Sequence, residues 1–189
     1  MNDVDESGLL ERARRGDEVA FSQLFDRYQR DIFRYAVHMC GAECGDDIVQ
    51  ETFLAVLRQR DRTDAPDRGV AAYLFGIARH LVLQRLGSKY EPAIEQQEDD
   101  GELVADGSTV LDDLTRAETI TAVRAAVRSL PPVYREVVVL CDLQDMDYAQ
   151  AARALQCPVG TVRSRLSRAR ALLMAKLSAA HSPASARKG

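Results

Sequence analysis

Residues 130–177 read LPPVYREVVVLCDLQDMDYAQAARALQCPVGTVRSRLSRARALLMAKL, and this stretch decides the fold of the C-terminal part of the chain. Pro131 and Pro132 stand where the first turn of a helix tolerates a missing N–H. A helix is therefore predicted from this pair to about Cys141. Its apolar residues include Val133, Val137, Val138 and Leu140.

Two further helices are predicted after this one. Asp147 is an N-cap residue, with a glutamine three residues later as its reciprocal partner, and it opens a short helix over 148–155. A turn at 156–157 leads to Pro158, which starts a longer helix that runs to about Leu177. A short helix, a tight turn and a longer helix predict a helix-turn-helix, whose second helix enters the major groove of DNA.

The longer helix has a buried and an exposed face. Helical periodicity predicts a buried stripe of Val162, Leu166, Ala169 and Leu173. The positions turned outward are Thr161, Arg163, Ser164, Ser167, Arg168 and Arg170. Such a charged face is usually solvated, but its arginines cluster beside the turn. Arginine binds phosphates and, with two hydrogen bonds, the O6 and N7 atoms of guanine, so we expect DNA contact.

Charge is distributed unevenly along the 189 residues, whose formal net charge is −4. Residues 1–86 carry a net charge of −3, residues 87–116 of −7 and residues 117–189 of +6. An acidic chain argues at first against a nucleic-acid partner, but the basic part is the one that contains the helix-turn-helix. This asymmetry points to a nucleic-acid-binding half.

Composition indicates a folded protein, since hydrophobic residues make up 46% of the chain. No apolar run approaches the ~20 residues of a membrane span, so we expect no membrane insertion and a cytoplasmic location. The cysteines, which lack the spacing of a zinc site, are Cys40, Cys44, Cys141 and Cys157. We expect small buried or loop thiols in a reducing cytosol, with a redox or metal role for Cys40 and Cys44 as the alternative.

The segments LPPVYREVVVL (130–140) and DYAQAARALQCPVGTVRSRLSRARALL (147–173) resemble region 4 of bacterial RNA polymerase sigma factors of the extracytoplasmic-function group. The resemblance implies that this region reads the upstream, or −35, promoter element in the major groove. The contact residues that it implies are Thr161, Arg163, Ser164, Ser167 and Arg168.

Residues 45–60, GDDIVQETFLAVLRQR, are predicted to form a helix with acidic residues at its N-terminus and an inward stripe of Val49, Phe53 and Val56. A different face carries Asp47, Gln50, Glu51 and Leu54. Taken alone, this face is a solvated one. However, residues 46–58 resemble region 2.2 of the same family, where this face grips the clamp coiled coil of the largest polymerase subunit. The resemblance thus implies the polymerase core, through its β and β′ subunits, as a partner.

Residues 70–87, VAAYLFGIARHLVLQRLG, are predicted to form a helix after the polar loop 61–69 and to stop at Gly87. Aromatic residues on a helix are usually core, but they can also stack on unpaired bases. The segment is similar to regions 2.3 and 2.4, which melt the −10 element and hold the nontemplate strand. The residues implied for this role are Asp64, Tyr73, Arg79 and His80. The family has Trp, Asn and Asp where this chain has Tyr73, His80 and Gln84, which leaves its −10 sequence preference open.

We expect an all-α chain of two small helical domains. Residues 1–87 would form region 2 and residues 114–178 region 4, joined by an acidic linker over 88–113 and followed by a disordered tail over 179–189. In the free protein, the linker either covers the basic arginine face or serves as a passive tether.

The resemblance implies a sigma factor that gives RNA polymerase its promoter specificity and helps to open the duplex, in a stress or envelope response. It would catalyse no bond chemistry and hold no cofactor or metal. Its partners would be core polymerase, promoter DNA and an anti-sigma factor. One alternative is a stand-alone helix-turn-helix regulator, which would need a receiver or ligand domain that is not readable in the sequence. The other alternative is an enzyme, but the sequence contains no recognisable nucleophile–base set or phosphate-binding glycine loop.

Overall fold

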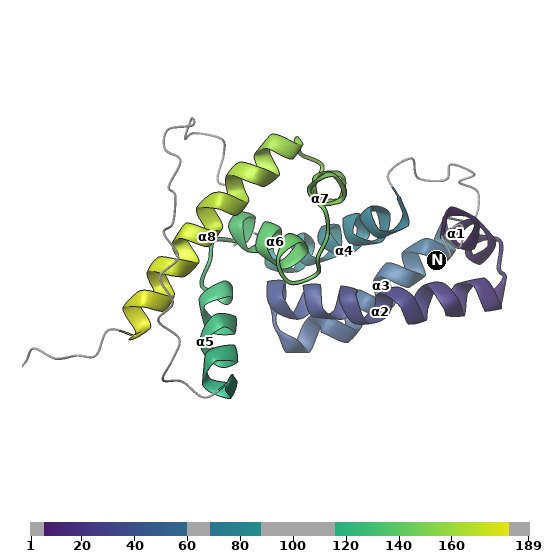
Figure 1. The fold of residues 1–189 in the computed structure, drawn as a ribbon. Coiled ribbons are helices and arrows are strands. Elements are labelled where there is room, and N and C mark those ends of the chain that lie inside the picture. The colour runs from purple at the N-terminus through teal and green to yellow at the C-terminus, as the bar shows by residue number, and fades with distance from the viewer. Residues whose placement is uncertain (1–5, 60–68, 88–115, 182–189) are drawn as a thin grey trace, which may run out of the picture.

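The computed structural model describes residues 6–59, 69–87 and 116–181, which form helices and no strand and so confirm the all-α prediction (Figure 1). The predicted contact residue Asp64, the linker 88–113 and the tail beyond residue 181 lie outside the described residues. The helices are α1 (Glu6–Arg14), α2 (Glu18–Cys40), the 3₁₀ helix η1 (Ala42–Cys44), α3 (Gly45–Arg58), α4 (Val70–Leu86), α5 (Arg116–Arg128), α6 (Pro132–Cys141), α7 (Tyr148–Leu155) and α8 (Val159–His181).

Helices α1 to α4 form the N-terminal half, and α2 is its longest element (Figure 1). Asp17 begins α2 as an N-cap, because its Oδ1 accepts hydrogen bonds from the backbone N–H groups of Val19 and Ala20 at 3.0 and 3.1 Å. The Ala20 bond and the neighbouring Arg12 guanidinium lower the pKa of the Asp17 carboxyl. The residues that α2 buries are Ala20, Leu24, Tyr28, Ile32, Tyr35, Ala36 and Met39.

The corner between α2 and α3 is held by a disulfide between Cys40 and Cys44, whose Cα atoms lie 6.4 Å apart. The expectation of separate thiols is therefore wrong for this pair. A spacing of four residues across the end of a helix and a 3₁₀ turn brings the two side chains within bonding range. Gly41 supports the turn, because its φ of 107° is a backbone conformation that favours glycine.

The other two cysteines, Cys141 and Cys157, are free and partly buried. Burial raises the pKa of both thiols, that of Cys141 to about 11. They therefore stay protonated and unreactive at neutral pH, as expected of structural thiols.

Helices α6 to α8 form the predicted helix-turn-helix. Pro132 is the first residue of α6, and Asp147 caps α7 by accepting the N–H of Gln150 at 2.7 Å. Gln156 then adopts a left-handed conformation, with φ of 55°, and makes the turn. Helix α8 continues past its predicted end at Leu177 to His181, because the intervening alanines are strong helix formers.

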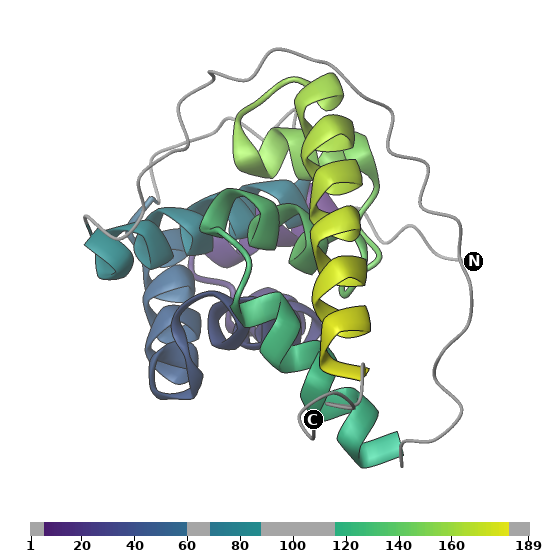
Figure 2. The same ribbon diagram turned by 90° about the vertical axis from the view of Figure 1, so that its left-hand side faces the viewer.

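The two halves pack directly against each other, a relationship that the sequence did not predict. Helix α7 lies against α4, and α6 lies against α2 (Figure 1). Figure 2 shows α8 running alongside the other helices of its half towards α5. One continuous apolar core joins the halves, and it includes Leu10 and Leu74 from the first and Leu140, Leu155 and Leu166 from the second. The closed arrangement of the halves therefore buries apolar surface from both.

His38 lies near the end of α2, where α5 and α6 approach it. Burial, followed by the positive charges of Arg124, Arg128, Arg34 and Arg135, lowers the pKa of His38 from its ordinary value of 6.5. The unfolded chain therefore binds a proton more readily at this site than the folded protein does. The contribution of neutral His38 to stability is complete above about pH 6.5 and declines as the pH falls below that value.

Replacing His38 with glutamine should flatten this decline, because glutamine does not titrate. Urea unfolding at about pH 5.5 and pH 7.5 compares the two proteins, and the wild type should lose more stability between these pH values than His38→Gln. The same loss in both proteins would contradict the prediction.

Candidate functional site

The exposed face of α8 carries the residues predicted to contact the −35 element. Val162, Leu166 and Ala169 are buried, and Leu173 is partly buried against the same core, which confirms the predicted stripe. On the outer side, Arg163, Ser164 and Ser167 are exposed, while Thr161 and Arg168 are partly exposed. Their side chains can therefore reach a ligand without any change in the fold of the helix-turn-helix.

Arg170 stands apart from this group, although it is on the same helix. Its Nε and one terminal nitrogen donate to the two oxygens of Asp142 at 3.1 and 2.6 Å, and the Asp142 hydrogen bond raises the pKa of Arg170. The pair joins α8 to the end of α6. Another contact that sequence reasoning missed is Tyr148, whose ring centroid lies 5.9 Å from the guanidinium carbon of Arg163.

The residues predicted to bind polymerase share the outer face of α3. Asp47, Gln50, Glu51 and Leu54 are all exposed, whereas Val49, Phe53 and Val56 are buried as predicted. Arg85 of α4 reaches across to this face and lies 3.2 Å from Asp47 and 3.3 Å from Glu51. Both carboxylates are about half exposed or more, so these ion pairs are weak and can be exchanged for a partner's cation.

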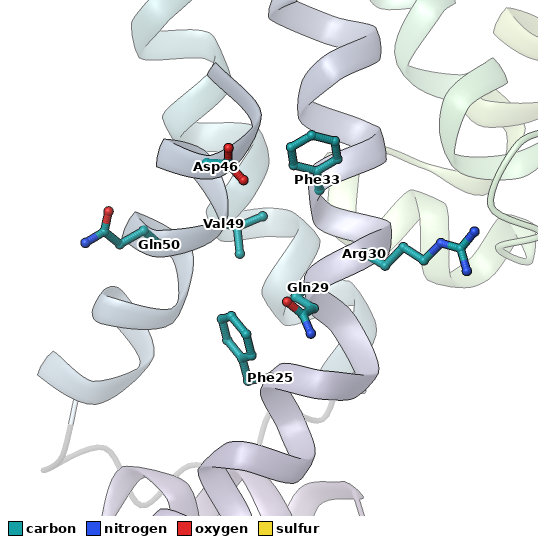
Figure 3. Close-up of a pocket in the computed structure, with 7 residues that line it drawn as sticks. All are labelled: Phe25, Gln29, Arg30, Phe33, Asp46, Val49 and Gln50. Atoms are coloured by element: carbon teal, nitrogen blue, oxygen red, sulfur yellow. The ribbon is translucent and has the colours of Figure 1, made fainter. Parts of the chain in front are cut away.

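A surface cavity of about 380 Å³ lies between α2 and α3, beside this face (Figure 3). Figure 3 shows Phe25 and Phe33 of α2 across from Val49 of α3, with the side chains of Arg30 and Gln50 pointing outward. The other lining residues are Gln29 and Asp46. Sequence reasoning missed the cavity, and the signal that could have found it is the pair of phenylalanines on one side of α2. The α3 face thus continues into a hollow with apolar walls and a polar rim.

The described residues predicted for the −10 element lie on α4, but they do not share one surface. The hydroxyl of Tyr73 donates to Oε1 of Gln59 at 2.8 Å, and the guanidinium of Arg14 lies 4.8 Å from the centre of its ring. His80 is exposed, with its Nε2 3.0 Å from the amide nitrogen of Gln84.

Arg79, by contrast, points towards the C-terminal half. Its Nε donates to Oε1 of Glu136 on α6 at 3.0 Å, and Glu136 is fully buried. Sequence reasoning missed Glu136, and the available signal was a glutamate directly before the apolar run VVVL. A carboxylate is buried in this way only when it has hydrogen-bond partners.

Within the described ranges, no group of three His, Cys, Asp or Glu side chains is arranged to hold a metal ion. The helices described there also include none that is long and apolar enough to cross a membrane.

Two family descriptions match the chain. Residues 24–90 match "Sigma-70 region 2" and residues 120–173 match "Sigma-70, region 4". The probable RNA polymerase sigma-C factor of Mycobacterium bovis is 31% identical over 180 residues, which cover 89% of each chain. The ECF RNA polymerase sigma factor SigW of Bacillus subtilis is 28% identical over 177 residues, covering 89% of this chain and 94% of SigW.

The fold is also similar to a solved structure, that of CnrH in complex with the cytosolic domain of CnrY. The two chains superpose with a TM-score of 0.69 and are 28% identical, over 92% of this chain and 97% of CnrH. The similarity covers both halves of the molecule and not the helix-turn-helix alone.

Proposed function

We propose, from the premise that this chain belongs to the extracytoplasmic-function group of the sigma-70 family, that it binds core RNA polymerase and directs it to specific promoters. The observation that carries this function is the outer face of α8, where Arg163, Ser164 and Ser167 remain exposed on a helix anchored by a buried stripe. Such a helix can enter the major groove and read base edges.

Polymerase docking is assigned to the outer face of α3. Its residues Asp47, Gln50, Glu51 and Leu54 are exposed and combine two acidic groups, an amide and an apolar side chain. This composition suits a partner surface with basic and apolar side chains, and the adjoining cavity offers it a place for an apolar group. The face lies on the N-terminal half and α8 on the other, so that one chain can hold polymerase and upstream DNA together.

The −10 element is assigned to α4 and the loop before it, through Asp64, Tyr73, Arg79 and His80. His80 is exposed on α4, and the aromatic ring of Tyr73 is suited to stacking on an unpaired base. Arg79 would bind the sugar–phosphate backbone, which positions a strand without reading its sequence.

The anti-sigma factor that the family resemblance implies is a further partner in this proposal. A protein partner is supported by CnrH, which shares the fold and was solved in complex with the cytosolic domain of CnrY. In this proposal the chain performs no bond chemistry itself, acts in the cytoplasm with polymerase and requires no cofactor. The domain assignment, with region 2 over 1–87, a linker over 88–113 and region 4 over 114–178, belongs to the same proposal.

Run-off transcription tests the function directly. Core polymerase with this chain should initiate on a subset of a promoter library, and core polymerase alone should not. DNA binding that needs no polymerase, together with no effect on initiation, would instead indicate a stand-alone regulator.

A charge reversal at Glu51 tests the docking face. Glu51→Lys should weaken binding to core polymerase at least about tenfold, because a cation would replace an acidic group in the contact. The side chain is 49% exposed and its ion pair with Arg85 is weak, so thermal stability should change little.

The matched control is Asp26→Lys, which makes the same charge change at an exposed position of α2 outside this face. Competition for core polymerase against a labelled wild-type chain measures both variants. If Glu51→Lys competes as well as the control does, the docking face lies elsewhere.

A further inference from the structure

Glu136 is the polar centre of the contact between the two halves. It belongs to α6, its side chain is fully buried, and it accepts a hydrogen bond from Nε of Arg79 on α4 at 3.0 Å. The hydroxyl of Tyr35 on α2 lies 3.4 Å from the same carboxylate oxygen. Two helices of the N-terminal half thus converge on one carboxylate of the C-terminal half.

Other polar contacts across the same boundary hold the halves together. Gln144, in the segment before α7, donates to the backbone oxygen of Asp31 at 2.7 Å. Arg34 of α2 donates to the backbone oxygen of Leu143. On the neighbouring side, Arg135 donates to the backbone oxygen of Met39 at 3.0 Å. The closed arrangement is therefore a specific contact with several independent hydrogen bonds.

The contact between Arg79 and Glu136 engages the guanidinium that would bind promoter DNA in the proposed function. In the proposed function Arg79 binds the −10 strand, yet its guanidinium is held here by Glu136, and α7 packs against the same helix. A carboxylate and a phosphate offer a guanidinium the same kind of charge-assisted hydrogen bond. While Glu136 holds it, the Arg79 side chain is only 20% exposed and α7 packs against its helix, so little of the guanidinium is accessible to a DNA strand.

We propose that Glu136 is an internal substitute for a DNA phosphate, and that the pair Arg79–Glu136 keeps the free chain in a closed form that cannot hold the −10 strand. The inference rests on the proposed role of Arg79 and α4. The halves must separate before a single strand binds, so the affinity for that strand is reduced by the fraction of molecules that are closed. The outer face of α8 stays exposed in the closed form, so duplex binding is not reduced in this way.

The test variant is Glu136→Gln in the full chain, which keeps the shape of the side chain and removes its charge. The matched control is Asp142→Asn, which removes the same charge from an ion pair that lies wholly within the C-terminal half, with Arg170. Arg34→Ala is a second test variant, since it removes a contact between the halves at a position whose side chain is 44% exposed and leaves the buried pair intact.

Three measurements are compared. Small-angle X-ray scattering gives the radius of gyration, and fluorescence anisotropy gives the affinity for labelled oligo-dT of about 12 nucleotides and for a labelled random duplex. Oligo-dT is a suitable probe because a phosphate contact does not depend on sequence.

Glu136→Gln should expand the molecule and bind oligo-dT at least about tenfold more tightly, while its duplex affinity stays within about twofold of that of Asp142→Asn. Arg34→Ala should also increase the radius of gyration and the affinity for oligo-dT, but by less. An unchanged radius of gyration and oligo-dT affinity in Glu136→Gln and Arg34→Ala would overturn the proposal. If Glu136→Gln fails to fold, as judged by circular dichroism, Arg34→Ala decides the matter.

Adding Arg79→Gln separates this inference from the function on which it rests. If Arg79→Gln weakens oligo-dT binding, yet Glu136→Gln binds oligo-dT no more tightly than wild type, Arg79 does contact the strand and the closed form is no barrier. A second outcome is that Glu136→Gln expands the chain while adding Arg79→Gln to that variant leaves its affinity for oligo-dT unchanged. In that case the proposed role of Arg79 fails, and the exchange of carboxylate for phosphate fails with it.

Discussion

Arg168→Ala is expected to weaken binding to the −35 element by about 1–3 kcal/mol and to relax the preference at one base pair. Arg168 lies on the outer side of α8 with part of its side chain exposed, in line with Ser164 and Ser167. A guanidinium in this place can donate two hydrogen bonds to a guanine edge. Losing both should affect a single base position, because the rest of the face is unchanged.

Binding selections over −35 variants measure this effect, with Arg170→Ala as the matched control. Arg170 is also an arginine of α8, but its guanidinium is engaged with Asp142. The control should therefore keep the wild-type sequence preference. An equal loss of affinity for every −35 sequence in Arg168→Ala would show that this residue contacts a phosphate and reads no base.

Leu166→Ala is expected to cost about 2–5 kcal/mol of folding stability. The side chain is only 2% exposed and forms part of the stripe that anchors α8 to the core. The truncation removes apolar contacts and leaves a cavity that the surrounding helices can close only in part. Because one core joins the halves, the loss should lower the stability of the whole molecule and not of α8 alone.

Leu172→Ala on the same helix is the control, since that leucine is 38% exposed and its truncation should change stability by less than about 1 kcal/mol. Urea unfolding followed by circular dichroism compares the two. A small effect of Leu166→Ala, similar to that of the control, would mean that the recognition helix is not anchored through this stripe.

The closed form would withhold one DNA-binding surface, and the linker could mask another. The charges of −7 over residues 87–116 and +6 over residues 117–189 predict that an acidic linker can cover the arginine face. The linker lies outside the described residues, so this remains a prediction. The two mechanisms differ in their target, because the linker would cover α8, whereas the Arg79–Glu136 contact withholds α4.

The sequence alone determined the features that depend on local physics. The prolines at 131 and 132, the Asp147 cap and the stripe from Val162 to Ala169 each follow from the needs of a single helix, and the structure confirms all of them. The exposed set on α3 was predicted for the same reason, since helical periodicity separates it from Val49, Phe53 and Val56.

Only the tertiary structure decided which side chains meet across the chain. Arg79 and Glu136 are 57 residues apart, and nothing in the local pattern of either helix selects the other as its partner. The Cys40–Cys44 bond required the three-dimensional path of the corner, and the pairing of Arg170 with Asp142 set one arginine of α8 apart from its neighbours. Periodicity determines which face of a helix is buried, but the partner of a buried charge depends on how the helices are brought together, and that depends on the whole fold.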